Sequence, residues 1–249
     1  MITFEHVTRQ YPDGTVARLG RREKLDHLLQ TGYDAVMGRS GAVPPAGRLT
    51  SKGALTRDRI VAAAAELMFE RGVAGTTMED VRAAAGVSSS QVYHYFADKS
   101  ALVRAVIEYQ DERIVGGQEP MLARLDSVAG LRAWRDFLVE HQRQLQCRGG
   151  CPIGSLASEV AETDSKARAV AATAFERWEA GIRGGFAAMS ERGELAPGTD
   201  PGRLATATLA ALQGALLLTQ IQRSTEPLEV TLDTVIDHVR SLTLSAAAP

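Results

Sequence analysis

Cysteine is scarce in this chain of 249 residues, which contains only Cys147 and Cys151. Two cysteines exclude a disulfide framework, and two thiols are too few for a structural zinc site, which needs four ligands, so we expect no bound metal. Two interpretations of the pair stay open. The thiols are small buried hydrophobic groups, or they form a redox switch whose thiol pKa is lowered with help from Arg148.

Neither sign of charge is in excess, because 28 Lys and Arg oppose 30 Asp and Glu for a net charge of −2. This balance excludes a globally basic nucleic-acid binder, but it leaves room for a local positive face on an otherwise acidic protein. No apolar run approaches the length of a membrane span, and the N-terminus lacks a signal-peptide core. We therefore expect a cytoplasmic protein with no membrane partner.

The patterns that mark common enzyme sites are also missing. The sequence has no G-x-x-x-x-G-K-[ST] phosphate loop, no Ser-His-Asp order, no metal cluster and no paired carboxylates. We therefore predict neither an enzyme nor a cofactor.

Residues 1–8 alternate like a strand, Tyr11-Pro-Asp-Gly14 is a turn signal, and residues 15–17 suit a returning strand. This opening resembles the first strands of an ABC-transporter ATPase, in which the residue at Tyr11 would stack on adenine. The resemblance then stops, because no phosphate loop follows. Residues 1–52 are therefore predicted to be an extension and linker, irregular or a short hairpin. The segment is either a fused or misassigned leader or a flexible arm.

The stretch 76–99 predicts two short helices joined by a tight turn. Thr76 or Thr77 offers a hydroxyl to the first helix, and Gly86 follows its last residue, where a left-handed cap is cheapest. A capping box that begins at Ser88 starts the second helix. A short helix, a glycine-containing turn and a second short helix make a helix-turn-helix.

The second helix presents an edge of polar and aromatic groups, because Val92 and Phe96 lie four residues apart and are expected to face the core. Such groups contact phosphates and base edges when a helix N-terminus enters the major groove. Lys99 lies beside this helix and is a candidate for a phosphate contact. The predicted DNA-binding residues are Thr76, Thr77, Ser88, Ser89, Ser90, Gln91, Tyr93, His94, Tyr95 and Lys99.

Residues 56–103 resemble the N-terminal domain of TetR-family transcriptional repressors. The first helix, which Thr56 is expected to cap, carries Ile60, Ala64, Leu67 and Phe69 before Gly72. The match continues through Thr76-Thr77, Val81, Ala85-Gly86-Val87-Ser88, Val92-Tyr93-His94-Tyr95-Phe96, Asp98-Lys99 and Leu102. The resemblance implies a three-helix domain, placed at 53–103, that binds double-stranded operator DNA.

Helical periodicity continues toward the C-terminus and predicts an all-α fold, with a helical domain over 104–245. We expect a helix over 99–115 that Gly116-Gly117 breaks, and an almost wholly apolar helix over 204–221. A helix that is apolar on nearly all sides must be buried on all sides. We therefore predict a homodimer in which this helix and the last one pair with their mates as a four-helix bundle, as TetR-family proteins do.

The stretch Cys147-Arg-Gly-Gly-Cys-Pro-Ile-Gly154, with Leu156, Ala157 and Glu159 after it, resembles a TetR subgroup that includes regulators of multidrug-resistance genes. In the family a small molecule enters the helical domain, moves the helix at 99–115 and releases DNA. The resemblance therefore implies a small-molecule effector. Residues with the apolar or amphipathic side chains of a ligand site are Trp134, Phe137, His141, Phe175, Trp178, Phe186, Met189 and Gln213. Packing in the core is the alternative for each.

The preferred hypothesis is a ligand-responsive, dimeric, DNA-binding regulator, most often a repressor in this family. One alternative is a helical interaction protein that keeps the helix-turn-helix only as a scaffold. The other is a regulator that senses redox state through Cys147 and Cys151.

Overall fold

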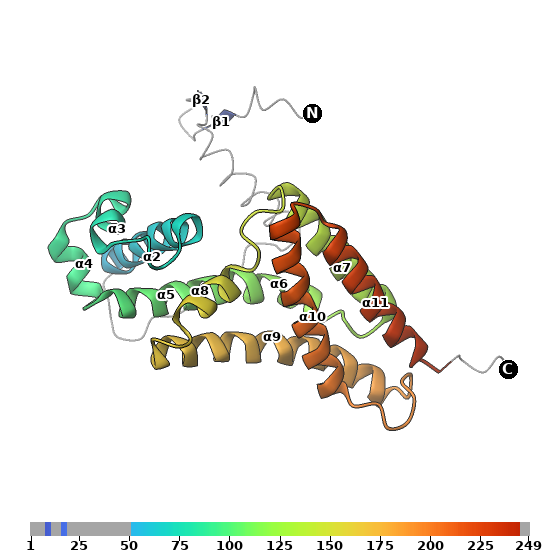
Figure 1. Cartoon of the computed structure of the whole chain (residues 1–249). Helices are drawn as coiled ribbons and strands as arrows, with labels where there is room; N and C mark the ends of the chain where they lie inside the picture. The colour runs from blue at the N-terminus through green and yellow to red at the C-terminus, as the bar shows by residue number, and fades with distance from the viewer. Residues whose placement is uncertain (1–7, 11–15, 19–50, 245–249) are drawn as a thin grey trace. The chain divides into compact units, whose positions relative to one another are not determined.

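The computed structural model describes residues 8–10, 16–18 and 51–244 (Figure 1). The chain divides into two compact units, 1–44 and 45–249. In the first unit, β1 (Thr8–Gln10) pairs antiparallel with β2 (Val16–Arg18), with Arg9 opposite Ala17. A short hairpin is one of the two forms predicted for the extension. Its predicted turn, 11–14, and residues 1–7 of its predicted first strand lie outside the described residues.

The second unit begins with three helices that we call the head: α2 (Ser51–Arg71), α3 (Met78–Ala85) and α4 (Ser89–Tyr95). The prediction that Thr56 caps the first helix is wrong, because α2 starts earlier in the sequence. The Thr56 hydroxyl lies within the helix and donates to the carbonyl of Lys52 at 3.0 Å. The buried side of α2 includes Ile60, Ala64 and Leu67, as its periodicity predicts.

Local caps determine where the two short helices begin and where the first of them ends. The Thr77 hydroxyl accepts a hydrogen bond from the N–H of Asp80, and the Asp80 carboxylate accepts one from the N–H of Thr77. Ser88 and Gln91 form the same reciprocal capping box at the start of α4, as predicted. Gly86 ends α3 with a φ of +62°, the left-handed conformation that glycine adopts at least cost.

We call the remaining helices the body. After α5 (Lys99–Asp111), η1 (Glu112–Gly116) and α6 (Gly117–Leu122) come α7 (Val128–Gln144), α8 (Pro152–Val160), α9 (Ser165–Glu191), α10 (Pro201–Gln222) and α11 (Glu226–Ser241). Figure 1 shows α9 running beside α5 and α6, and α10 packing with α11. In the part of the chain that the structure describes, the β1–β2 pair and a single bridge between Leu195 and Thr243 are the only β structure. The all-α class is confirmed.

The helix that leaves the head runs farther than predicted. Asp98 caps α5, which passes through the single π-helical turn η1 directly into α6. The predicted break at Gly116-Gly117 is wrong, because both glycines are buried in packed helix, which offsets a propensity cost of about 1 kcal/mol each. The predicted domain boundary after residue 103 falls inside α5, and the division into 1–52, 53–103 and 104–245 stays a prediction.

Buried apolar side chains form two clusters. The head cluster joins α2, α3, α4 and α5 and also takes in Leu156 and Val160 from α8, with Ala167 and Ala171 from α9. The body cluster joins η1 and α6 to α7, α9, α10 and α11, and includes Ile153 from α8. Helix α8 therefore contributes to both clusters within nine residues.

The prediction that no apolar run approaches the length of a membrane span is wrong for helix α10. Its 22 residues include a window with a mean hydropathy of 1.5, so by length and composition alone it would suit one. Packing accounts for part of this apolar character, because Leu204, Leu209, Leu212 and Leu216 are buried in the body cluster. A core helix of a globular protein has the same composition.

Two adjacent glycines of α9 allow a matched test of how closely α9 packs on the segment after α6. A Cβ at Gly185 would lie 2.6 Å from the backbone carbonyl group of Leu125, whereas one at Gly184 meets nothing within 4 Å. We expect Gly185→Ala to lower the free energy of unfolding by about 1–3 kcal/mol through overpacking. We expect Gly184→Ala to raise it by about 0.5–1 kcal/mol, since alanine favours helix. Urea unfolding followed by circular dichroism measures both, and equal midpoints would contradict the close approach.

Candidate nucleic-acid interface

Helix α4 presents its predicted polar edge to solvent. The exposed residues on this edge are Ser88, Ser89, Ser90, Gln91, Tyr93 and His94. Val92 and Phe96 are only 1% and 3% exposed and attach α4 to the head cluster. Tyr95 is half-buried against the same cluster and meets the His94 ring edge-on, with 4.9 Å between ring centroids.

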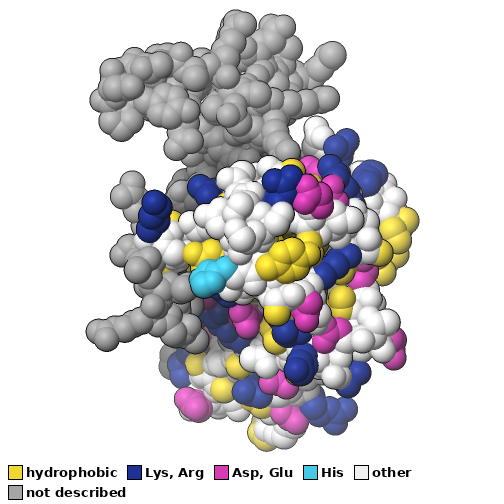
Figure 2. All heavy atoms as spheres, turned by 90° about the vertical axis from the view of Figure 1, so that its left-hand side faces the viewer, with side chains coloured by type: hydrophobic (Ala, Val, Ile, Leu, Met, Phe, Trp, Pro, Cys, Tyr) yellow, Lys and Arg dark blue, Asp and Glu magenta, His cyan; other side chains and the backbone are white. Residues whose placement is uncertain are grey.

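Figure 2 looks onto the side of the second unit on which α3 and α4 lie, where Lys and Arg side chains, with Asp and Glu among them, lie around uncharged groups and a histidine. Lys99 is half-buried at the start of α5. The Arg57 guanidinium lies over the Phe96 ring, 5.5 Å from its centroid, which brings a cation from α2 to the end of α4. Sequence reasoning missed Arg57, because no local spacing marks an arginine on one helix as the neighbour of a ring on another.

Two acidic residues of α3 are held by local partners. Arg82 donates from Nε to the Glu79 carboxylate at 2.8 Å, and this bond is the main cause that lowers the pKa of Glu79. The Thr77 hydroxyl donates to the Asp80 carboxylate at 2.6 Å and is the main cause that lowers the pKa of Asp80. Both carboxylates stay ionised at neutral pH, and Arg82 is engaged within α3.

The two threonines before α3 have different roles. Thr77 caps the helix and is exposed. Thr76 is 1% exposed, and its hydroxyl donates to the carbonyl of Gly72 at 2.9 Å. This hydroxyl stabilises the turn between α2 and α3 and is not on the surface. We therefore remove Thr76 from the predicted DNA-binding residues.

Two family sequence profiles match the chain. Residues 60–106 match bacterial regulatory proteins of the tetR family, and residues 127–234 match the C-terminal domain of LmrA/YxaF-like transcriptional regulators. The first match covers the helix-turn-helix, and the second runs from α7 into α11. This chain belongs to the TetR family of transcriptional regulators. The resemblance predicted for both halves is confirmed, and with it a role in DNA binding.

Relatives of this TetR-family protein match it over most of their own length. An uncharacterized HTH-type transcriptional regulator of Mycobacterium tuberculosis is 29% identical over 202 residues, which cover 76% of this chain and 94% of that protein. The HTH-type transcriptional repressor DhaR of a Mycobacterium species is 27% identical over 183 residues, which cover 73% and 90%.

Solved structures agree with the fold. The regulatory protein TetR from Rhodobacter sphaeroides gives a TM-score of 0.64 at 27% identity, over 74% of this chain and 98% of that one. A TetR transcriptional regulator from Chloroflexus aurantiacus gives a TM-score of 0.65 at 29% identity, over 77% and 98%. The likeness therefore includes the body as well as the head.

The predicted ligand-lining residues lie in the body, most of them packed in its core. Trp134, Trp178, Phe186 and Met189 are at most 1% exposed in the body cluster. Phe137 and Phe175 are half-buried against it, and His141 and Gln213 are also half-buried. These placements suit packed core residues as well as the wall of a ligand site, so their role in ligand binding stays a prediction.

Polar groups lie among these aromatic rings. The indole N–H of Trp134 donates to the side-chain oxygen of Gln118 at 2.8 Å, whereas the indole N–H of Trp178 is buried without a hydrogen-bond partner. His141 stacks on Phe137 with ring centroids 6.1 Å apart. Burial is the main cause that lowers the pKa of His141, so its imidazole is neutral at pH 7.

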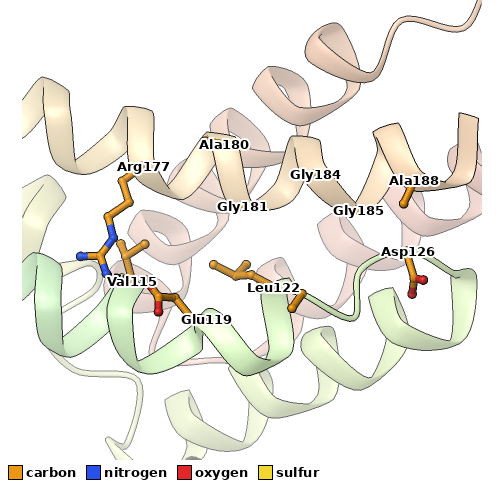
Figure 3. A pocket seen from close by; sticks show the side chains of 11 residues that line it. Val115, Glu119, Leu122, Asp126, Arg177, Ala180, Gly181, Gly184, Gly185 and Ala188 are labelled. Atoms are coloured by element: carbon orange, nitrogen blue, oxygen red, sulfur yellow. Dashed lines mark hydrogen bonds and ion pairs between the residues drawn. The ribbon is translucent and has the colours of Figure 1, made fainter. Parts of the chain in front are cut away.

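A cavity of about 580 Å³ opens between α9 and the η1–α6 segment (Figure 3). It is lined by Val115, Glu119, Leu122, Ala123, Asp126, Arg177, Ala180, Gly181, Gly184, Gly185 and Ala188. The Arg177 guanidinium is engaged at one end, where it pairs with Asp111, Glu112 and Glu119. None of the predicted ligand residues lines this cavity. Sequence reasoning missed it, because small residues on a helix carry no chemical signal.

Both cysteines are buried, Cys147 at 6% exposure and Cys151 at 7%. Burial is the main cause that raises the pKa of each thiol above its usual value, which is the opposite of what a redox switch needs. The redox-sensing alternative is therefore not supported. Within the described residues, no group of three or more His, Cys, Asp or Glu is arranged to hold a metal ion.

The burial of both thiols predicts that they react slowly with alkylating reagents. Because burial raises both pKa values, the reactive thiolate is rarer at neutral pH than in the unfolded chain. We expect alkylation of Cys147 and Cys151 by iodoacetamide to be at least about tenfold slower in the folded protein than in urea. Mass spectrometry of a labelling time course measures both sites. Fast labelling of either cysteine in the folded protein would restore the redox hypothesis.

Proposed function

We propose that this protein is a dimeric repressor that binds a near-palindromic operator through α4 and leaves it when a small molecule binds the body. The observation that carries the proposal is the exposed polar edge of α4, held outward by the burial of Val92 and Phe96. Hydroxyl, amide and imidazole groups at a helix N-terminus suit the base edges and phosphates of the major groove. The relative DhaR, which is named a repressor, supports repression.

The proposed contacts divide by chemistry. Tyr93 and His94 are free to reach base edges, and the cations Arg57 and Lys99 suit phosphates. The Gln91 side-chain oxygen accepts from the N–H of Ser88 at 2.9 Å, which leaves the amide N–H groups of Gln91 to donate to DNA. The proposed contact set is Arg57, Thr77, Ser88, Ser89, Ser90, Gln91, Tyr93, His94, Tyr95 and Lys99.

An apolar face on α10 and α11 supports the dimer. Leu217, Leu218 and Ile221 on α10 are 55%, 46% and 67% exposed, and Val230 on α11 is 58% exposed. Large exposed apolar groups gathered on two adjacent helices favour an interface. A second copy of the chain is the proposed partner, because a two-fold dimer presents two α4 helices to DNA, and helices about 34–36 Å apart, one turn of DNA, fit successive major grooves.

The body is the proposed site of the effector, a small molecule of the cytoplasm that the aromatic residues named above would contact. The unpartnered indole N–H of Trp178 supports this, since a buried donor without an acceptor costs about 1–3 kcal/mol and an accepting ligand atom would remove that cost. A ligand that lowers DNA affinity must itself bind the DNA-bound form less well by the same factor. The proposed role is regulatory and not enzymatic.

DNA binding by α4 is tested with a duplex selected from random sequence by the purified protein. We expect Tyr93→Ala and His94→Ala each to weaken binding to this duplex by at least about tenfold, because each removes a contact to a base edge or phosphate. We expect Lys99→Ala to weaken binding to all sequences alike and to reduce the salt slope by about one. Fluorescence anisotropy measures the affinities, with Ser190→Ala on α9 as control. Unchanged affinity in both α4 variants would refute the proposed reading by α4.

The dimer face is tested by placing a charge on it. We expect Leu218→Glu to raise the dimer dissociation constant at least about 100-fold, because burying two unpaired carboxylates against an apolar face is costly. Ala172→Glu places the same charge on an exposed position of α9 and should leave association unchanged. Sedimentation velocity measures both. A wild-type protein that sediments as a monomer would contradict the dimer.

A further inference from the structure

The turn between α2 and α3 is held by a side chain from the body. The Glu159 carboxylate, near the end of α8, accepts hydrogen bonds from the backbone N–H groups of Val73 at 2.8 Å and Ala74 at 3.3 Å. The partners lie 86 and 85 residues apart in the sequence. Hydrogen bonds to a carboxylate are stronger than those between neutral groups, and we call this pair of bonds the clamp.

Gly72 provides the space for this carboxylate. Its φ of +75° is left-handed, and a Cβ there would lie 3.0 Å from the Glu159 carboxylate. The Gly72 carbonyl also accepts the buried hydroxyl of Thr76, and the next residue, Thr77, caps α3. The clamp therefore acts on the short turn that leads directly into the helix-turn-helix.

Helix α8 connects the α2–α3 turn to the body, because it packs in both clusters. Leu156 and Val160 are buried in the head cluster, whereas Ile153, one turn earlier, is buried in the body cluster. A short helix held in two cores cannot shift in one without moving in the other, because protein interiors are close-packed.

The loop before α8 makes a second pair of contacts. A Cβ on Gly149 would lie 1.8 Å from the Phe69 ring of α2, so loop and head are in close contact there. On its other side the loop meets α10: a Cβ on Gly150 would lie 2.6 Å from the side-chain oxygen of Gln220, and Arg223 donates to the carbonyl of Cys147 at 2.8 Å. Residues 147–160 thus connect the head to α10.

We propose that Glu159 is a positioning residue for DNA binding, which sets the angle of the head on the body through α8, separately from the covalent link through α5. This inference rests on the proposed binding of operator by α4 in a dimer. Because α10 carries the proposed dimer face, residues 147–160 link that face to the α2–α3 turn. The separation of the two α4 helices then depends on the Glu159 clamp.

The experiment compares Glu159→Ala and Glu159→Gln with Glu162→Ala. Glu162 is an exposed glutamate in the turn after α8, so its loss changes the charge equally and leaves the clamp intact. Glu159→Gln keeps the side-chain size and one accepting oxygen, so it remains informative if Glu159→Ala folds poorly. Anisotropy measures affinity for the selected duplex and for the same duplex with one base pair inserted between its half-sites. Hydrogen exchange of residues 72–77 in the free protein reports the clamp itself.

We expect Glu159→Ala to speed exchange at residues 73–74 and to weaken binding to the selected duplex about tenfold, with about threefold weakening for Glu159→Gln. Glu162→Ala should stay within about twofold of wild type, the ordinary range for a surface substitution. A head that is loosely held tolerates altered spacing, so the penalty for the inserted base pair should shrink in Glu159→Ala. A merely destabilised protein would lose affinity for both duplexes equally.

Three outcomes would overturn the inference. Unchanged exchange at residues 73–74 would refute the clamp. Faster exchange with unchanged DNA affinity would refute a role of the clamp in DNA binding. If the inserted base pair weakened binding by Glu159→Ala as much as it weakens binding by the wild type, the proposal that Glu159 positions the head would be refuted. A wild-type protein that selects no DNA would instead refute the proposed function, while the exchange comparison would still test the clamp.

Discussion

The burial of Val92 and Phe96 is the constraint on which the DNA-binding surface depends. Helix α4 has seven residues, far fewer than an isolated helix needs to be stable in water, so it exists because the head cluster and its caps hold it. Each buried side chain contributes about 1.5–3 kcal/mol at most. The same burial determines which residues face outward, because the other side chains of α4, apart from half-buried Tyr95, do not pack on the head cluster. The polar edge is thus a consequence of packing on the opposite side of α4.

The parts of the fold that could be predicted from the sequence are those that depend on neighbours within a few residues. Thr77, Gly86, Ser88 and Asp98 each cap a helix through groups at most four residues away, and each acts where its residue type predicts. Helical periodicity likewise predicted the helix over 204–221, which the structure places at Pro201–Gln222. The family assignment rests on the same local pattern, since the helix-turn-helix is a run of caps and apolar spacings.

Predictions failed where tertiary packing overrode a local signal or where partners are distant in the chain. Gly116-Gly117 is a helix breaker by propensity, but burial of Val115 and Leu122 on either side keeps the chain helical through η1. Periodicity marks Trp134 and Phe186 as inward-facing, yet it cannot distinguish a core from a ligand site. Arg57 beside Phe96 and Glu159 beside the α2–α3 turn are contacts between separate helices, and a single sequence carries no sign of either.

The strength of the contacts between head and body determines whether a small molecule can control DNA binding. Moving the head by repacking the shared core would cost several kcal/mol, because buried side chains tolerate little change in shape. Each of the two charge-assisted bonds is worth roughly 1.5–3 kcal/mol before solvent screening, and screening at the exposed carboxylate brings the pair near the roughly 1–3 kcal/mol of a typical coupling free energy between two sites. A contact of that size is strong enough to favour one angle of the head and weak enough for a bound ligand to oppose. Control through Glu159 would therefore require the ligand to shift α8 slightly, without unfolding either cluster.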